Sequence, residues 1–287
     1  MNNLSSRFPR GSEWRRWDLH VHTPESILNS QFRSWDSYVH ALFTKAIEKG
    51  VQVIGITDYF LVDGYRKLKQ EYLADQEKLR RLFAVELSED PGYLEKLQAI
   101  LVLPNVELRL NKLIPTKGDA KHRRLNWHVV MDGEVDVGQL ESDFISRMEF
   151  TWRWASGGGV ERRSVSRKNL EELGRRLKAE QPEFAEQSDA VVGCINATVD
   201  EEQVCKILKN SDLFRERHLT VFAEEDASKV SWSGDPGLAI CERRFHAERE
   251  KRFAWEDVGD DSRFRFRATL GVTGTGIGIP DSGSHQR

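Results

Sequence analysis

Two histidines that alternate along a short apolar segment are the residues of this chain best suited to chemistry. The segment runs from Trp17 to Thr23 and places His20 and His22 two residues apart. Side chains of a strand alternate between its two faces, so both imidazoles project to the same side. Neutral imidazoles are good ligands for zinc, manganese or iron. The sequence therefore predicts a divalent metal site at the end of this strand.

Further strand candidates each carry a residue that such a site can use. They cover 51–58, 102–110 and 126–131. The first ends in Asp58, the second contains Glu107 and Arg109 on one face, and the third contains His128. In a barrel of parallel strands, the active-site groups come from several strands and meet at the carboxyl ends. We expect these four residues to lie close to His20 and His22.

Each of these residues has an expected role and a structural alternative. We expect Glu107 to bridge two metal ions, His128 to be a further metal ligand, and Asp58 and Arg109 to act in catalysis. Arg109 would bind a substrate phosphate. The alternatives are a cap on the following turn for Asp58, an ion pair with a basic neighbour for Glu107, and a buried core histidine for His128.

The order of these motifs resembles the PHP (polymerase and histidinol phosphatase) superfamily. The resemblance rests on D-L-H-x-H-T at 18–23, I-T-D at 56–58, then a strand glutamate and a strand histidine. It is closest to the PHP domain that precedes an ATPase in TrlF-type proteins, which are linked to DNA repair and phage defence. The resemblance implies an α/β fold, a distorted (β/α)7-type, TIM-like barrel. It also implies one to three divalent ions (Zn, Mn or Fe) and phosphoester hydrolysis by a metal-activated water.

Three features depart from the superfamily pattern. A typical member has an aspartate ligand where this chain has Asn29, and a histidine ligand where it has Tyr59. The resemblance to TrlF-type proteins implies that both residues are usual in that subgroup. A late Asp-x-His pair is missing altogether, which implies a barrel that is incomplete at its C-terminus.

The rest of the chain predicts the elements that position these residues. Periodicity predicts helices over 34–49, 64–82, 136–152, 168–178 and 199–209, with Ser34 as an N-cap and Gly50 as a C-terminal glycine. Further strands are predicted over 189–195 and 219–223. Alternating strands and helices favour a parallel sheet or barrel.

The chain divides into two parts by its composition. Residues 1–234 carry the resemblance, from about Gly11, and form the expected phosphoesterase domain. Residues 235–287 form an atypical tail, first heavily charged and then rich in Gly and Ser. A disordered linker and a frameshifted or truncated product are the alternatives for this tail.

Composition places few limits on function. The chain has 287 residues, a net charge of -3 and no apolar run long enough to span a membrane, and its N-terminus lacks an apolar signal core. We therefore expect a cytoplasmic protein. Three cysteines without a C-x-x-C motif predict reduced thiols. Basic runs over 109–124 and 153–168 are candidate phosphate contacts, and solvated loops are their alternative.

Three function classes fit these observations. The first is a metal-dependent phosphoesterase that acts on nucleic acid or nucleotides, with an ATPase as partner. The second is a catalytically impaired PHP-like module that binds nucleic acid or regulates a partner ATPase. The third is an amidohydrolase-like enzyme, because those barrels also open with an H-x-H strand. It ranks last, since no convincing late histidine pair is present.

Overall fold

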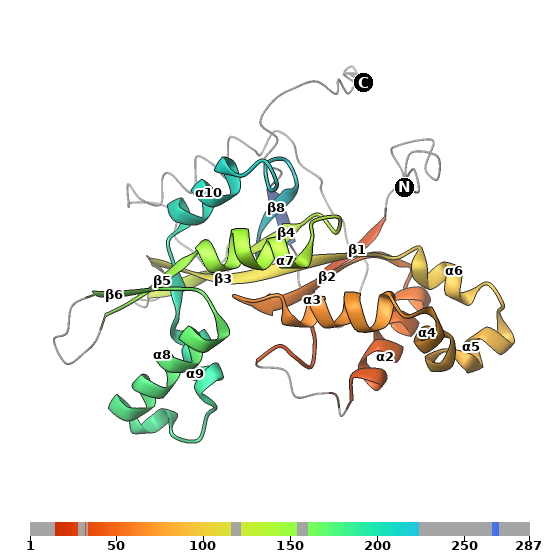
Figure 1. Cartoon of the computed structure of the whole chain (residues 1–287), viewed down its shortest axis with the longest axis horizontal. Coiled ribbons are helices and arrows are strands. Elements are labelled where there is room, and N and C mark those ends of the chain that lie inside the picture. Colours follow the sequence, from red (N-terminus) through yellow and green to blue (C-terminus); the bar gives the residue numbers. More distant parts are fainter. Residues whose placement is uncertain are drawn as a thin grey trace, which may run out of the picture.

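The computed structural model describes residues 15–27, 32, 34–115, 122–153, 160–223 and 266–269. It is an α/β fold built on one nine-stranded sheet (Figure 1). The strands are β1 (Arg16–His22), β2 (Val51–Tyr59), β3 (Leu101–Pro115), β4 (His122–Met131), β5 (Glu149–Arg153), β6 (Val160–Ser164), β7 (Thr198–Val199), β8 (His218–Ala223) and β9 (Phe266–Thr269).

The first three strands form the parallel arrangement that the sequence predicts. β1 pairs with β2 and β2 pairs with β3, all in parallel. The sheet then becomes mixed, because β4 runs antiparallel to β3 and lies between β3 and β8. Only six residues separate β3 from β4, too few for the crossover that two parallel strands need. The predicted parallel arrangement therefore does not extend to β4.

The long strand β3 changes its neighbour on one edge. Its first half pairs with β2, and the last pair in that ladder is Tyr59 with Glu107. β3 continues beyond this point, and Leu110 pairs with Val199 of β7. An edge of β3 is thus left between the end of β2 and the start of β7. Ligands of α/β sheets commonly bind beyond the carboxyl ends of strands, where the topology changes in this way.

The helices lie in three groups around the sheet. In Figure 1, α2 to α6 gather at the right beside β1 and β2, α8 and α9 lie at the lower left, and α10 lies above the sheet. The helical segments are α2 (Trp35–Glu48), α3 (Asp63–Lys67), η1 (Leu68–Leu73), α4 (Gln76–Leu82), α5 (Ala84–Glu89), α6 (Tyr93–Gln98), α7 (Val137–Gln139), η2 (Leu140–Phe144), η3 (Ile145–Arg147), α8 (Arg167–Glu180), η4 (Pro182–Phe184), α9 (Asp189–Asn196) and α10 (Glu201–Asn210).

Several helix predictions are confirmed at their ends. The hydroxyl of Ser34 accepts a hydrogen bond from the backbone N–H of Ser37 and caps α2. Gly50 follows the helix with a φ of 65°, a left-handed conformation that glycine adopts at little cost. The predicted helices over 168–178 and 199–209 correspond to α8 and α10.

Other predicted elements differ from the structure. The segment 189–195 is a helix, α9, and not a strand, because Ser188 caps its start and Gly193 allows close packing against the backbone of Leu170 on α8. Short apolar runs do not distinguish a buried strand from a buried helix. The helix predicted over 136–152 ends at Arg147, and β5 begins at Glu149. The helix predicted over 64–82 is divided into α3, η1 and α4.

Apolar side chains cover both faces of the sheet, but unequally. The main core packs between the helices and one face, and includes Ile54, Ile56, Val106 and Leu108. A small cluster on the other face consists of Leu19, Val53, Leu103, Val130 and Val221. By strand alternation, Glu107 and His128 share the face of the small cluster, whereas Asp58 shares the face of Ile54 and Ile56. The sheet therefore separates Asp58 from the other candidate residues.

Three further expectations concern membrane spans, cysteines and the C-terminal tail. No helix within the described ranges is both long and apolar enough to cross a bilayer. Cys194 is a buried free thiol, as the sequence predicts. Within the tail predicted for 235–287, the structure describes only β9, which pairs antiparallel with β8. The rest of the tail and Asn29 lie outside the described residues.

Candidate metal centre

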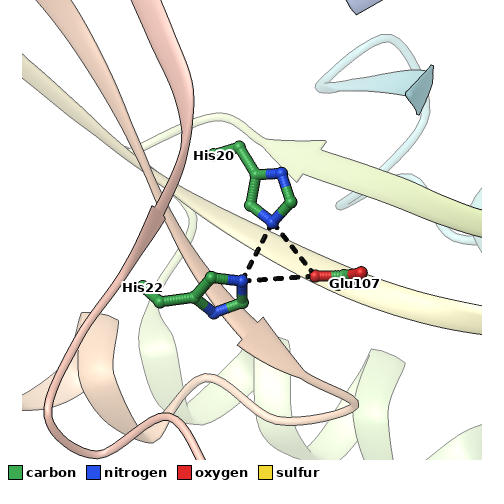
Figure 2. Close-up of side chains that lie close together, drawn as sticks. All are labelled: His20, His22 and Glu107. Atoms are coloured by element: carbon green, nitrogen blue, oxygen red, sulfur yellow. Dashed lines mark hydrogen bonds and ion pairs between the residues drawn. The ribbon is translucent and has the colours of Figure 1, made fainter. Parts of the chain in front are cut away.

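Three side chains from two strands bring their ligand atoms together above the sheet. The Nε2 atoms of His20 and His22 lie 2.9 Å apart. They lie 3.3 and 3.5 Å, respectively, from Oε2 of Glu107. Figure 2 shows the two imidazoles of β1 and the carboxylate of β3 pointing toward one another. The two histidines and Glu107 were predicted to act together, and the fold places them so.

These distances fit a divalent ion held among the three atoms. Two ligands each about 2.0–2.1 Å from an ion lie about 3 Å apart in octahedral and about 3.4 Å apart in tetrahedral geometry. The three observed separations fall close to this range. Two imidazole nitrogens and a carboxylate oxygen are also the donor set that zinc, manganese and iron accept. The group of residues therefore suits a divalent metal ion.

The ring of His22 is held in place from two directions. Its Nδ1 lies 2.9 Å from the hydroxyl of Ser26, and the ring of Tyr59 stacks on it with 4.9 Å between centroids. When Nδ1 donates its hydrogen to Ser26, the lone pair of Nε2 faces His20 and Glu107. Burial, followed by the charge of His20, lowers the pKa of His22. The neutral ring that a metal ligand requires is therefore favoured.

Glu107 is the buried member of the group. Its side chain is only 3% exposed, compared with 12% for His20 and 23% for His22. Burial alone raises the pKa of Glu107, but the hydrogen bond to His20 and the charges of the nearby histidines outweigh it, so the pKa is lowered. The amide Nδ2 of Asn126 donates to Oε1 at 2.7 Å. This leaves an ionised carboxylate whose other oxygen faces the imidazoles.

His128 was expected to be a further metal ligand. It lies beside the group formed by His20, His22 and Glu107 but is not part of it. Its ring meets the ring of His20 edge-on, with 4.7 Å between centroids, and its Nδ1 lies 3.2 Å from Nδ2 of Asn105. That amide also donates to Leu19 O at 2.6 Å, which fixes its orientation. The same Nδ2 donates to Oγ1 of Thr57 at 2.9 Å, so its two hydrogens serve Leu19 and Thr57. Burial lowers the pKa of His128 to about 4.

The lowered pKa favours a neutral ring for His128. It is not a member of the group of converging ligand atoms. Its role as a further metal ligand remains a prediction.

Asp58 caps the turn that follows β2, which is the structural alternative to a role in catalysis. Its Oδ2 accepts hydrogen bonds from the backbone N–H groups of Gly64, at 2.9 Å, and Tyr65, at 3.4 Å, at the start of α3. Burial raises the pKa of Asp58 to about 7. A contribution of Asp58 to catalysis stays a prediction, and its visible contacts orient α3 below the sheet.

Arg109 lies next to the metal group, at the edge of β3 that β2 leaves free. A pocket there is lined by Tyr59, Phe60, Glu107, Leu108, Arg109, Asn126, Cys194 and Ile195. The guanidinium of Arg109 donates from Nε to Oδ1 of Asn126 and from a terminal nitrogen to the carbonyl of Ile195 in α9. A guanidinium has five N–H groups, so others remain for an anion in the pocket.

The backbone beside this pocket is in an unusual conformation. Phe60 follows β2 with a φ of 61°, which is rare for a bulky residue. Its ring is buried, and its N–H donates to the carbonyl of Glu107 at 3.0 Å. Strained backbone of this kind tends to be retained at functional sites, where the surroundings hold it in place.

Three described side chains of the predicted basic runs form ion pairs. Lys112 pairs with Glu201 at 2.6 Å, Arg163 with Glu161 at 2.6 Å, and Arg167 with Asp63 at 2.6 Å. These pairs favour a structural role for those three side chains. Residues 116–121 and 154–159 of the two runs lie outside the described residues.

Asn105 and Asn126 were not singled out in the sequence. Asn126 stands two residues before His128 on the same strand, and Asn105 two residues before Glu107. The period of two along a strand places each amide on the same face as its neighbour. An Asn-x-His and an Asn-x-Glu pattern within strands are the signals that point to them.

Comparison with known proteins adds no relative to this description. No protein-family model matches the chain, and no curated protein matches its sequence. The resemblance to the PHP superfamily therefore rests on the motifs alone.

The first prediction concerns metal content. Purified protein should contain near-stoichiometric zinc, manganese or iron by elemental analysis, and the double variant His20→Ala/His22→Ala should lose it, since two of three ligand atoms are removed. His40→Ala is the control, because His40 pairs with Glu86 at 2.7 Å, outside the metal group. Equal metal content in the wild type and the double variant would contradict the assignment.

The second prediction concerns Asp58 and stability. Its pKa is about 7 in the folded protein against an ordinary 3.8, so between these values the folded state holds a proton that the unfolded state has released. The free energy of unfolding should therefore fall as pH rises from about 4 to about 7, by at most about 1.4 kcal/mol per pH unit from this group. Asp58→Asn should flatten this decline, since an amide keeps an acceptor for α3 but does not titrate.

Urea denaturation at several pH values measures this effect. Asp212→Asn is the control, because the Asp212 side chain is 94% exposed. Parallel curves for the wild type and Asp58→Asn would show that Asp58 is not the group responsible.

Proposed function

We propose that this protein is a metal-dependent phosphoesterase. The observation that carries the proposal is the convergence of His20, His22 and Glu107, whose ligand atoms all lie within 4.8 Å of one another beside the Arg109 pocket. A divalent ion held there supplies Lewis acidity and activates a water for attack on phosphorus. Zinc, manganese and iron all suit the donor set.

The side chains around the ion divide the remaining tasks. His20, His22 and Glu107 hold the ion, and Arg109 binds the non-bridging oxygens of the phosphate. His128 packs edge-on against the ring of His20 and supports its position. Tyr59 restricts the position of His22 through ring stacking and closes one side of the pocket.

The fold and the motif order support a more specific reading. β1, β2 and β3 run parallel, and β1 and β3 carry the metal group, an arrangement compatible with the start of a TIM-like barrel. We infer a distorted barrel of the PHP type, closest to the TrlF-type domains. On this reading the substrate is nucleic acid or a nucleotide, the setting is DNA repair or phage defence in the cytoplasm, and an ATPase is the partner.

Hydrolysis assays test the proposal directly. The protein is loaded separately with Mn²⁺, Zn²⁺ or Fe²⁺ and assayed on single-stranded DNA, a nucleoside monophosphate and bis-p-nitrophenyl phosphate. We expect hydrolysis that a chelator stops and that His20→Ala/His22→Ala abolishes. Nucleic-acid binding that survives chelation, without turnover under any metal, would instead support a non-catalytic binding module. Turnover of a cyclic amide alone would support an amidohydrolase.

Arg109 should contribute to catalysis through the phosphate. A hydrogen bond to a charged group contributes about 1.5–3 kcal/mol, so Arg109→Ala should lower kcat/KM by roughly 10- to 100-fold. Arg109→Lys should retain part of this activity, because it keeps the charge but loses the paired geometry.

Two measurements accompany these variants. Metal content must stay at the wild-type level, so that the loss is assigned to the phosphate and not to the ion. Arg175→Ala on α8 is the control, because Arg175 pairs with Glu172 on the helix surface. Wild-type kcat/KM in Arg109→Ala would exclude a role in substrate binding.

A further inference from the structure

Asn126 connects the carboxylate of the metal group to the arginine of the pocket. It lies on β4 directly opposite Arg109 of β3. Its Nδ2 donates to Oε1 of Glu107 at 2.7 Å, and its Oδ1 accepts from Nε of Arg109 at 3.4 Å. One amide thus contacts both functional side chains of β3.

The chemistry of these neighbours fixes the orientation of the amide. A carboxylate only accepts hydrogen bonds, and a guanidinium only donates them. Nδ2 must therefore face Glu107 and Oδ1 must face Arg109. An amide side chain meets both demands, whereas an aspartate lacks the donor and a leucine of similar size lacks both groups.

The contact with Asn126 determines which carboxylate oxygen of Glu107 faces the histidines. Oε1 is occupied by the amide hydrogen, so Oε2 lies 3.3 and 3.5 Å from the two imidazole nitrogens. Without this contact, the terminal torsion of a glutamate has no strong preference and the carboxylate could turn. The amide therefore selects a single-oxygen mode of ligation by Glu107.

We propose that Asn126 is a positioning residue that aims Oε2 of Glu107 at the metal ion and holds Arg109 beside it. The proposal rests on the proposed metal-dependent function and assigns to β4 a part in building the site. Asn126 is only half-buried and lines the pocket together with Glu107 and Arg109. Its place at the rim of the site, outside both apolar clusters, distinguishes it from a core residue.

Titration with Co²⁺ tests the proposal without relying on activity. Visible absorption of bound Co²⁺ reports both the affinity and the geometry of the ligands. Loss of a residue that orients a ligand typically lowers metal affinity 10- to 100-fold. We expect Asn126→Leu to show a loss of this size and a changed absorption spectrum, because Glu107 is no longer held to one oxygen.

The control variant makes the same substitution on β3. Asn111→Leu changes an exposed amide two residues beyond Arg109, and should bind Co²⁺ with wild-type affinity and spectrum. Thermal unfolding of each variant shows whether it folds. If Asn126→Leu does not fold, Asn126→Ala removes the same two hydrogen bonds with less crowding and carries the test.

The outcomes separate this proposal from the one on which it rests. If the wild type binds Co²⁺ and a folded Asn126 variant binds it with the same affinity and spectrum, the role of Asn126 is overturned and the metal site remains. Absence of Co²⁺ binding by the wild type itself would overturn the metal-dependent function and this proposal with it. Weakened binding with an altered spectrum, confined to the Asn126 variants, would support it.

Discussion

The buried carboxylate of Glu107 is the constraint on which the site depends. An ionised carboxylate is costly to remove from water unless hydrogen bonds and opposite charges compensate for it. The fold supplies this compensation from three directions: the imidazoles of His20 and His22 on β1, and the amide of Asn126 on β4. Because these partners come from β1 and β4 and Glu107 lies on β3, the three strands must keep their register for the carboxylate to remain ionised. A divalent ion among the same atoms would relieve the remaining cost.

The topology of the sheet explains why this carboxylate is reachable at all. β2 ends beside Glu107, and β3, still paired with β4 on its other edge, continues along this edge until it meets β7. The chain leaves β2 through the left-handed Phe60 and enters α3, whose first N–H groups are held by Asp58 on the opposite face. One strand end thus does two things: it opens the edge of β3 to a ligand, and it anchors the helix layer beneath. Arg109 and α9 then form the far wall of the opening.

The arrangement separates the groups that bind a cation from those that bind an anion. His20, His22 and Glu107 offer lone pairs that suit a cation. Arg109 lies two residues beyond Glu107 on β3 and offers N–H groups that suit an anion. Asn126 and Asn105 supply neutral donors and acceptors that hold these charged or titratable side chains without adding charge of their own. The phosphate-carrying substrate that we propose would meet both requirements, because its oxygens would contact a bound ion and the guanidinium at once.

The sequence by itself determined the pair on β1, the carboxylate on β3 and the approximate extents of α2, α8 and α10, because these follow from local periodicity, from caps such as Ser34, and from the alternation of faces along a strand. It could not determine which residues of different strands meet. That Asp58 turns away from the site, that His128 faces the Asn105 amide, and that Asn126 links Glu107 to Arg109 all depend on strand register and direction. The reversal of β4 and the helical state of α9 were decided by loop length and helix packing. These are tertiary properties, since they arise from contacts between segments far apart in the chain.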